Sequence, residues 1–372
     1  MRQVELGQLN PSDNTVWMID EAAMMDTHRM AGLLQVTGNG RIVMVGDSAQ
    51  LSPIGAAGWY AESVADHGSV HLSQVFRQRD ERDVADYKLI REGQGSQAVQ
   101  NLDARGRVHV SADKATRLGN VMADYKGLRE SGYEASQVRQ VIETSNHDVD
   151  TMNRFVQRDR LARQEISDRG FQVEDTEQGR RWSIHNNDQV IFLKAHQEGR
   201  VTVRNGTTGV VKAINSRGEV AIDTGKETVV VHLEPRKHSQ PLGLAYAQHA
   251  QKLQGGEVDH VQVLPGSEHT ANANSGYSQM TRAKHEAHVY LDAESFPGDS
   301  VAGLGKAWEQ RDEPRSAQWH AAQVVEELAY THEQPDEPAQ EEHIGNMADY
   351  FMQRVYERQQ QERAEQEVGM SR

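Results

Sequence analysis

The sequence predicts an α/β protein in which helices flank parallel sheets, with a small β-barrel inserted and a helical tail at the C-terminal end. The first indication is two short, continuously apolar runs, 16–19 and 42–45, of the kind that buried parallel strands show. Between them, Met30, Leu33 and Leu34 share one face of a helical stretch. A strand, a helix and a strand with short connections form a βαβ unit, which predicts a parallel sheet.

A change of pattern farther along the chain predicts the inserted barrel. Residues 82–180 are charged and favour helices, with one strand-like stretch at 138–142. From 182 to 235, short apolar runs alternate with Asn-Gly, Thr-Gly and Arg-Gly turns, so we expect a small SH3-like β-barrel, after which the α/β pattern resumes at Gly243. The expected strands are 190–193, 201–203, 209–214, 220–222 and 229–233 in the barrel, and 261–264 and 289–291 after it.

Composition limits the class of protein. The 372 residues are enough for two domains, and the absence of cysteine excludes disulfides and thiolate metal sites. The first ten residues lack the basic flank and apolar run of a signal peptide, and no stretch approaches the roughly 18 apolar residues that span a bilayer. We therefore expect a soluble, cytoplasmic protein without a membrane span. The net charge of −15 argues against a nucleic-acid coat protein, but not against a motor that grips one strand in a groove.

Two carboxylates, Asp20 and Glu21, directly follow the first apolar run. Ligands of open α/β sheets bind at the carboxyl ends of the strands. Magnesium prefers oxygen ligands such as carboxylates, and phosphoryl transfer to water needs a group that orients or deprotonates the water. We therefore expect Asp20 to hold Mg²⁺ and Glu21 to activate water. An acid pair at a solvated helix start is an equally good interpretation of these two residues alone.

The second apolar run ends in the loop GDSAQLSPIG, residues 46–55, at the same edge of the predicted sheet. Gln50 is suited to hydrogen-bond a γ-phosphate or its attacking water, and we expect Gly46 and Asp47 beside it in the nucleotide site. A GDxxQ loop by itself is more often only a turn. Two neighbouring strands that both end in polar residues favour the functional interpretation.

Six segments in order resemble the motifs of superfamily 1 helicases, most closely the RecD-like branch, which includes the helicase part of conjugative relaxases of the TraI/TrwC (MobF) type. VWMIDEAAMM and IVMVGDSAQLSPIGAAG resemble motifs II and III, LSQVFRQ motif IV, QKLQG motif V and YSQMTRAK motif VI. Between motifs IV and V, NDQVIF and VRNGTTGVV are similar to a barrel segment of that branch. The resemblance covers residues 1–295 and implies RecA-like domains, ATP and Mg²⁺ as cofactors, and single-stranded DNA as the partner.

The resemblance also assigns two arginines to ATP hydrolysis. Arg77 in motif IV and Arg282 in motif VI match the family's contacts to the γ-phosphate. A guanidinium is a permanently charged fork of donors, which suits the charge that develops on phosphoryl oxygens. Arginines on the second domain make hydrolysis depend on closure of the two domains. For any single arginine, an exposed surface position is the alternative.

Motif V departs from the family pattern. Where the family has threonine, histidine and threonine, this sequence has His249, Gln251 and Glu257. We still expect Lys252 to contact DNA phosphates, and Gln254 and Gly255 to line the nucleotide site.

Further contacts to DNA are expected near the loop after the second strand and in motif VI. The residues are Ser52, Pro53 and Thr281. Trp59 and Tyr60 offer rings that stack on bases, although core packing is at least as good an interpretation of Trp59.

A phosphate-binding loop, G-x-x-x-x-G-K-[ST], does not occur in the 372 residues, and only fifteen residues precede Val16. We therefore expect a fragment, from a truncated gene, a disrupted reading frame or a split protein, that binds ATP poorly alone. Its expected parts are a remainder of the first RecA-like domain (1–75), the start of the second (76–181), the barrel (182–240), the rest of the second domain (241–300), and an acidic, helical or partly disordered tail (301–372).

Two functions fit the sequence. The first is the C-terminal part of an ATP-dependent, 5′-to-3′ DNA helicase of a conjugative relaxase, completed by an upstream fragment with a phosphate-binding loop. The second is a non-enzymatic DNA-binding or recruitment module. An apolar stripe in the tail, Met347, Tyr350, Phe351 and Val355, either docks a partner in the conjugation machinery or packs on its own domain.

Overall fold

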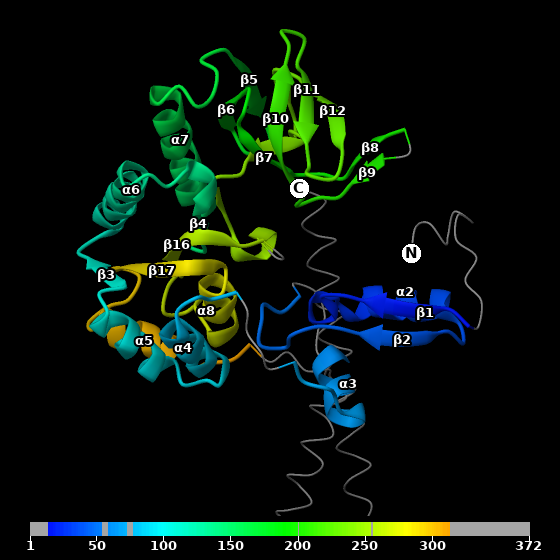
Figure 1. Cartoon of the computed structure of the whole chain (residues 1–372), viewed down its shortest axis with the longest axis vertical. Coiled ribbons are helices and arrows are strands. Elements are labelled where there is room, and N and C mark those ends of the chain that lie inside the picture. Colours follow the sequence, from blue (N-terminus) through cyan, green and yellow to red (C-terminus); the bar gives the residue numbers. More distant parts are fainter. Residues whose placement is uncertain (1–13, 54–58, 73–76, 200, 254–255, 313–372) are drawn as a thin grey trace, which may run out of the picture. The chain divides into compact units, whose positions relative to one another are not determined.

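The computed structural model describes residues 14–53, 59–72, 77–199, 201–253 and 256–312 (Figure 1). The chain divides into two compact units, residues 1–315 and 316–372, and every described residue belongs to the first. The apolar stripe of the tail therefore lies outside the described residues.

The first described elements form the predicted βαβ unit (Figure 1). β1 (Val16–Ile19) and β2 (Arg41–Met44) pair in parallel, and α2 (Thr27–Thr37) lies between them in the chain. Asp26 caps α2, because its side chain accepts the N–H of Arg29 at 2.8 Å and so satisfies a free donor of the first turn. The prediction of strand, helix and strand is confirmed.

The prediction that both strands are buried is wrong for one face of this small sheet. Met18 is 75% exposed, Val16 57% and Val43 44%. Ile19 and Leu33 are instead buried in a cluster that α2 and the two strands share. Side chains alternate across a strand, so a helix packed on one face leaves the apolar side chains of the other face in water.

The main sheet has five strands in the order β15-β4-β16-β17-β3, and all four pairings are parallel. The strands are β3 (Val108–Ser111), β4 (Val138–Ile142), β15 (Ala247–Gln248), β16 (Val258–Leu264) and β17 (Ala283–Asp292). Three of them contain the strands expected from the sequence, whereas β3 and β15 were not expected. The predicted α/β class with a parallel sheet is confirmed.

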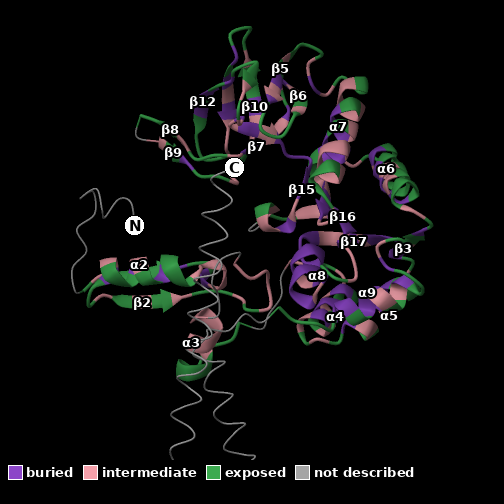
Figure 2. Cartoon of the chain, turned by 180° about the vertical axis from the view of Figure 1, so that it is seen from behind, coloured by how far each residue is buried: buried purple, intermediate pink, exposed green. Residues whose placement is uncertain are grey.

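Helices bury both faces of the main sheet, as the purple core in Figure 2 shows. Apolar residues of four helices pack with the sheet in one cluster: α4 (Glu81–Arg91), α5 (Gly95–Ala104), α8 (Ala273–Met280) and α9 (Ser300–Ala307). Two further helices supply a second cluster: α6 (Lys114–Glu130) and α7 (Asn146–Ala162). The remaining helical segments are α3 (Trp59–His67) and three 3-10 turns, η1 (Ala22–Met24), η2 (Ala135–Gln137) and η3 (Ala250–Leu253).

The expected β-rich insertion is present, and its core is larger than the sequence predicted. An antiparallel sheet has the order β12-β11-β10-β7-β14. Its strands are β7 (Gln189–Phe192), β10 (Thr208–Ile214), β11 (Glu219–Asp223), β12 (Thr228–His232) and β14 (Leu242–Leu244), with a hairpin of β8 (His196–Glu198) and β9 (Val201–Val203). An SH3-like topology stays a prediction.

A second small sheet belongs to this insertion, which therefore begins before residue 182, the start that the sequence predicted. It contains β13 (Arg236–Lys237), β5 (Gly170–Asp175) and β6 (Arg180–His185). Val173 and Ile184 of this sheet are buried in the same cluster as the strands of the antiparallel sheet. The helix-rich expectation for residues up to 180 is therefore wrong from residue 170 onward.

The α/β core also extends past residue 300, into the segment assigned to the tail. Leu304 and Trp308 are fully buried. A side-chain carbon at Gly276 would lie 2.5 Å from the ring of Trp308, and one at Gly95 would lie 2.4 Å from its backbone. Two glycines therefore admit Trp308 between α5 and α8.

Among the described residues, every helix is too short or too polar to cross a bilayer.

Candidate functional site

Asp20 and Glu21 lie where predicted, in the turn between β1 and η1. The Oδ1 atom of Asp20 accepts the N–H of Glu21 at 3.0 Å, and Glu21 has a left-handed backbone with φ of 54°. The N–H of Ala22 donates to the carbonyl of Val45 at 2.9 Å. This bond ties the end of β1 to the end of β2, so the two polar loops share one edge of the sheet. Both carboxylates are exposed there.

Gly46 begins the second loop and leaves no room for a side chain. A Cβ atom at this position would lie 2.8 Å from the backbone nitrogen of Ala23 and 3.0 Å from the ring of Tyr60. The hydroxyl of Tyr60 donates to the Gly46 carbonyl at 3.0 Å. The glycine thus lets the loop pass between the first turn and α3.

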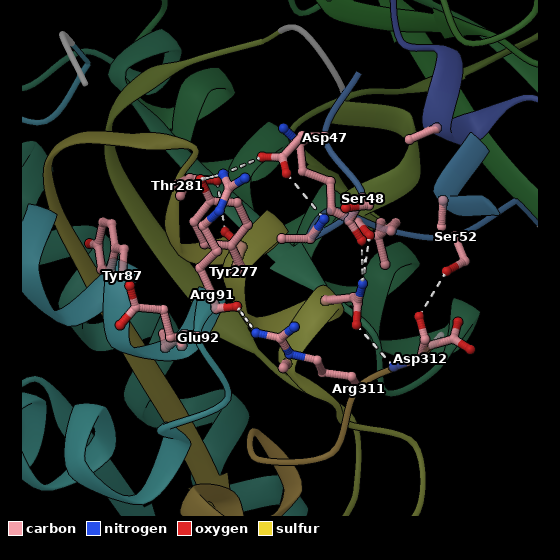
Figure 3. Close-up of a pocket in the computed structure, with 18 of the residues that line it drawn as sticks. Asp47, Ser48, Ser52, Tyr87, Arg91, Glu92, Tyr277, Thr281, Arg311 and Asp312 are labelled. Atoms are coloured by element: carbon pink, nitrogen blue, oxygen red, sulfur yellow. Dashed lines mark hydrogen bonds and ion pairs between the residues drawn. The ribbon is translucent and has the colours of Figure 1, made fainter. Parts of the chain in front are cut away.

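Asp47 is engaged by a residue that the sequence analysis did not identify. Its carboxylate forms an ion pair of 2.9 Å with Arg91 of α4 and accepts the N–H of Ala49 at 3.1 Å. The guanidinium of Arg91 lies 5.7 Å from the centre of the Tyr277 ring and donates to its hydroxyl at 3.3 Å. Asp47 therefore positions its own loop and joins it to α4 and α8, as Figure 3 shows.

The same loop is held on α8 by two further side chains that the sequence did not single out. The amide nitrogen of Asn274 donates to the carbonyls of Ser48 at 3.1 Å and Gln50 at 2.9 Å. The hydroxyl of Ser278 accepts the N–H of Leu51 at 3.0 Å. Backbone groups of a polar loop are thus satisfied by a helix that lies more than two hundred residues away in the chain.

Arg282 lies near three of the other four predicted catalytic residues, Glu21, Gln50 and Arg77. It is only 4% exposed, and its Nε atom donates to the carbonyl of Ser278 at 2.8 Å. An Nη atom donates to the side-chain oxygen of Gln50 at 3.3 Å. Burial lowers the pKa of the Arg282 guanidinium, the positive charge of Arg77 lowers it further, and the carboxylate of Glu21 raises it. Gln50, Arg77 and Glu21 therefore all lie within electrostatic or hydrogen-bonding range of this arginine.

Arg77 lies against the end of α8. Its guanidinium donates to the Thr281 carbonyl at 2.9 Å and forms an ion pair of 3.2 Å with Glu257, which Lys284 also contacts at 2.8 Å. Residues 73–76 of motif IV, just before it, lie outside the described residues. Glu257, one of the departures in motif V, is thus the carboxylate that holds Arg77 in place.

The predicted DNA contacts fall in two separate places. Ser52 and Pro53 line a cavity of about 620 Å³ beside α4 and α8, drawn in Figure 3, together with the largely buried Thr281. The hydroxyl of Ser52 donates to the Asp312 carbonyl at 3.3 Å, and that of Thr281 to the Tyr277 carbonyl at 2.7 Å.

Lys252 is exposed and lines a different cleft, next to α7. Gln254 and Gly255, expected in the nucleotide site, lie outside the described residues. Trp59 donates from its indole to the Met25 carbonyl at 2.5 Å and packs against the cluster of Ile19 and Leu33. Core packing is thus the structural role of Trp59.

The chain is similar to several known proteins. The AAA domain family matches residues 2–113. The "Probable conjugal transfer protein TraA" of Sinorhizobium fredii (strain NBRC 101917 / NGR234) is 30% identical over 295 residues, which are 78% of this chain and 26% of that protein. The "Conjugal transfer protein TraA" of Agrobacterium fabrum is 29% identical over 304 residues, 81% of this chain and 26% of that protein. The Bacteroides Pif1 structure, solved bound to ssDNA, aligns with a TM-score of 0.48 at 16% identity, over 86% of this chain and 76% of that one.

In its motifs the chain resembles a superfamily 1 helicase segment of the conjugative relaxase type, and residues 2–113 match the AAA domain family. Within that class the chain is a relative of the TraA conjugal transfer proteins. It spans about a quarter of the length of these curated relatives.

Proposed function

We propose that this chain supplies the hydrolytic side of an ATP-dependent, 5′-to-3′ single-stranded DNA helicase that acts in conjugative transfer. The observation that carries the proposal is the convergence of Gln50 and Glu21 on the buried Arg282, from segments that lie more than two hundred residues apart. A buried arginine whose guanidinium already bonds the side chain of Gln50 suits the terminal phosphate of a nucleotide.

Each group has a role in this proposal. Glu21 orients and deprotonates the attacking water. Gln50 hydrogen-bonds the γ-phosphate, and its bond to Arg282 links the presence of that phosphate to the end of α8. Arg77 and Arg282 stabilise the charge on the transferred phosphoryl group. Gly46 and Asp47 shape the loop that carries Gln50, since Asp47 is already bonded to Arg91.

The residues present suit magnesium. Only one oxygen of the exposed Asp20 carboxylate is engaged by the neighbouring N–H among the described contacts, which leaves oxygen donors at the strand end. In ATPases, Mg²⁺ is held by one or two carboxylates together with substrate phosphates, so no larger cluster of acidic residues is needed. Bound there with ATP, the ion would neutralise phosphate charge.

The remaining phosphate contacts come, in this proposal, from a segment that carries a phosphate-binding loop. The curated relatives are about four times as long as the matched region, so they have room for such a segment. The exposed apolar face of Val16, Met18 and Val43 is suited to pack against it. A separate upstream relaxase fragment and the conjugation machinery are the candidate partners.

Single-stranded DNA is the proposed substrate. Ser52 and Pro53 border the cavity next to the nucleotide loop, and the exposed ammonium of Lys252 is available to a phosphate. Thr281 contributes only indirectly in this proposal: its carbonyl accepts a hydrogen bond from Arg77 and so positions that arginine, while its hydroxyl donates within its own helix.

The test is ATP hydrolysis by a hybrid in which the segment of the Sinorhizobium fredii TraA that precedes the matched region is joined to this chain. We expect hydrolysis that single-stranded DNA stimulates. Glu21→Gln should lower kcat by about a hundredfold or more while ATP still binds, because general bases contribute that much. Arg282→Lys should lower kcat by a similar or larger factor.

Glu130→Gln, an exposed carboxylate on α6, is the matched control and should keep the parental kcat. A Glu21→Gln hybrid that hydrolyses ATP at the parental rate would refute the assignment of the base. Unwinding of tailed duplexes from a 3′ tail, and not from a 5′ tail, would refute the proposed direction.

A further inference from the structure

A second cleft, of about 350 Å³, lies away from the nucleotide site. It is lined by residues of α7, by strands of the β-rich insertion and by residues between Ala247 and Lys252. The volume is at the lower end of the range for sites that bind small molecules. Among its lining residues are Gln248, Trp182, Arg180, Arg154 and Lys252.

Gln248, in β15, is the unusual member of the cleft. Its side chain is 2% exposed, and neither the amide nitrogen nor the amide oxygen has a hydrogen-bond partner among the described residues. Asn153, on α7 in the same cleft, shows the contrast. Its amide donates to the Ala247 carbonyl at 3.0 Å and accepts the N–H groups of Tyr246 at 2.8 Å and Ala247 at 3.0 Å. Buried amides are normally satisfied in this way, so the free donor and acceptor of Gln248 indicate a missing partner.

A second side chain of the cleft repeats this pattern. The indole N–H of Trp182 is also buried and without a partner in the described part of the chain. The guanidinium of Arg180 lies 5.9 Å from the centre of the Trp182 ring, and Asp150 holds it there at 3.0 Å. An aromatic side chain and a glutamine, each with an unpaired buried polar group, therefore line the same small space.

Positive charge is available at the edge of the cleft. Arg154 and Lys252 are both exposed, and neither forms an ion pair with a described residue. Partial loss of water and the neighbouring charge of Arg180 lower the pKa of Lys252. An anion bound beside Arg154 and Lys252 would offset the repulsion between Lys252 and Arg180.

We propose that this cleft binds one base of the single strand, that the amide of Gln248 pairs with the edge of that base, and that adenine is preferred. A glutamine amide matches the adjacent donor and acceptor of adenine in two hydrogen bonds. The Trp182 ring suits the flat face of a base, while Arg154 and Lys252 suit the flanking phosphates. This inference rests on the proposed function, because it takes single-stranded DNA as the substrate.

The test uses the full 372-residue chain and fluorescence anisotropy with labelled oligodeoxyadenylate, oligodeoxythymidylate and an abasic strand of equal length. Wild-type protein should bind oligodeoxyadenylate about tenfold more tightly than the other two strands. Gln248→Leu should remove this preference and leave affinity for the abasic strand unchanged. It should also raise the melting temperature of the free protein, because an unpaired buried amide is replaced by an apolar group.

Gln100→Leu, an exposed glutamine on α5, is the control and should change neither the preference nor the melting temperature. If Gln248 had only a structural role, Gln248→Leu would lower the melting temperature and leave the base preference unchanged, which would contradict the proposal. Equal affinity of the wild type for all three strands would overturn the base pocket but leave the proposed function standing. Failure to bind any of the strands would overturn both.

Discussion

His249 has a hydrogen-bond acceptor on each side of its imidazole. Its Nδ1 atom lies 3.6 Å from a carboxylate oxygen of Glu143, and its Nε2 atom lies 3.0 Å from the side-chain oxygen of Asn146. The nearby carboxylate of Glu143 raises the pKa of His249 more than burial lowers it. At the position where the helicase family has a threonine, this chain thus has an imidazole whose pKa lies above its ordinary value.

The raised pKa predicts how stability depends on pH. The folded chain binds the His249 proton more tightly than the unfolded chain, so the contribution to stability is complete below about pH 6.5, the unfolded value. It is lost as the pH rises through the folded pKa. Glu143→Gln should lower the pKa of His249 and flatten this part of the stability profile. NMR titration of the imidazole and urea unfolding at several pH values measure the two effects. The exposed Glu227→Gln is the control, and a His249 pKa that stays unchanged in Glu143→Gln would contradict the assignment.

At the level of single residues, the sequence located the groups that belong to local motifs and missed those that support them from far away. Glu21 and Gln50 lie in the loops that follow two strands, and Arg282 follows a helix in a recognisable motif, so local pattern was sufficient. Arg91 and Asn274 bind the same loop from 44 and 226 residues away. Nothing in the local pattern of one sequence indicates which distant arginine or asparagine folds back on a given loop.

At the scale of elements, a buried ion-pair network joins α6, α7 and β17. Arg117 on α6 is 1% exposed and contacts Asp292 at the end of β17, which is fully buried, and Asp148 on α7 at 3.1 Å. Removing one partner of such a network leaves an uncompensated charge in a medium that solvates it poorly. The three elements are therefore tied to one another by charge as well as by apolar packing.

Arg117→Met should destabilise the chain by about 3–5 kcal/mol, because Asp292 would remain charged and buried. Lys114→Met provides a matched control on the same helix. Lys114 contacts Glu294 at 3.6 Å but is 60% exposed, so its loss should cost less than about 1 kcal/mol. Urea unfolding followed by circular dichroism measures both values. Equal effects of the two substitutions would show that burial of the Arg117 network does not matter.

The elements that the sequence predicted correctly are those with a strong apolar signal. β4 has the predicted bounds, Val138–Ile142, since it is a central strand covered on both faces. β5 and β6 were missed because they bury one face only and are rich in charge, as in Gly170–Asp175 and Arg180–His185. Their alternating apolar residues, Val173 and Ile184 among them, are too few to outweigh the charged helical pattern around them.

At the scale of the whole molecule, the main parallel sheet and the small sheet of β1 and β2 differ in how completely other elements cover them. Helices bury both faces of the five-stranded sheet, whereas the two-stranded sheet of β1 and β2 has an apolar face in water. Apolar side chains that remain exposed on neighbouring strands are a common site of association. The sequence predicted both strands but not this difference, because an apolar run gives no information on which of its faces finds a neighbour.

Charge on the exposed face should therefore change association without changing stability. Met18 is 75% exposed, so Met18→Lys should leave the free energy of unfolding within about 0.5 kcal/mol of wild type. In sedimentation velocity it should reduce self-association of the chain, and in the hybrid with the TraA segment it should lower DNA-stimulated ATP hydrolysis, because the lysine would be buried at the junction. Val230→Lys, on a strand residue of the insertion that is 44% exposed, should do neither. A hybrid that tolerates Met18→Lys as well as it tolerates Val230→Lys would show that the added segment does not cover this face.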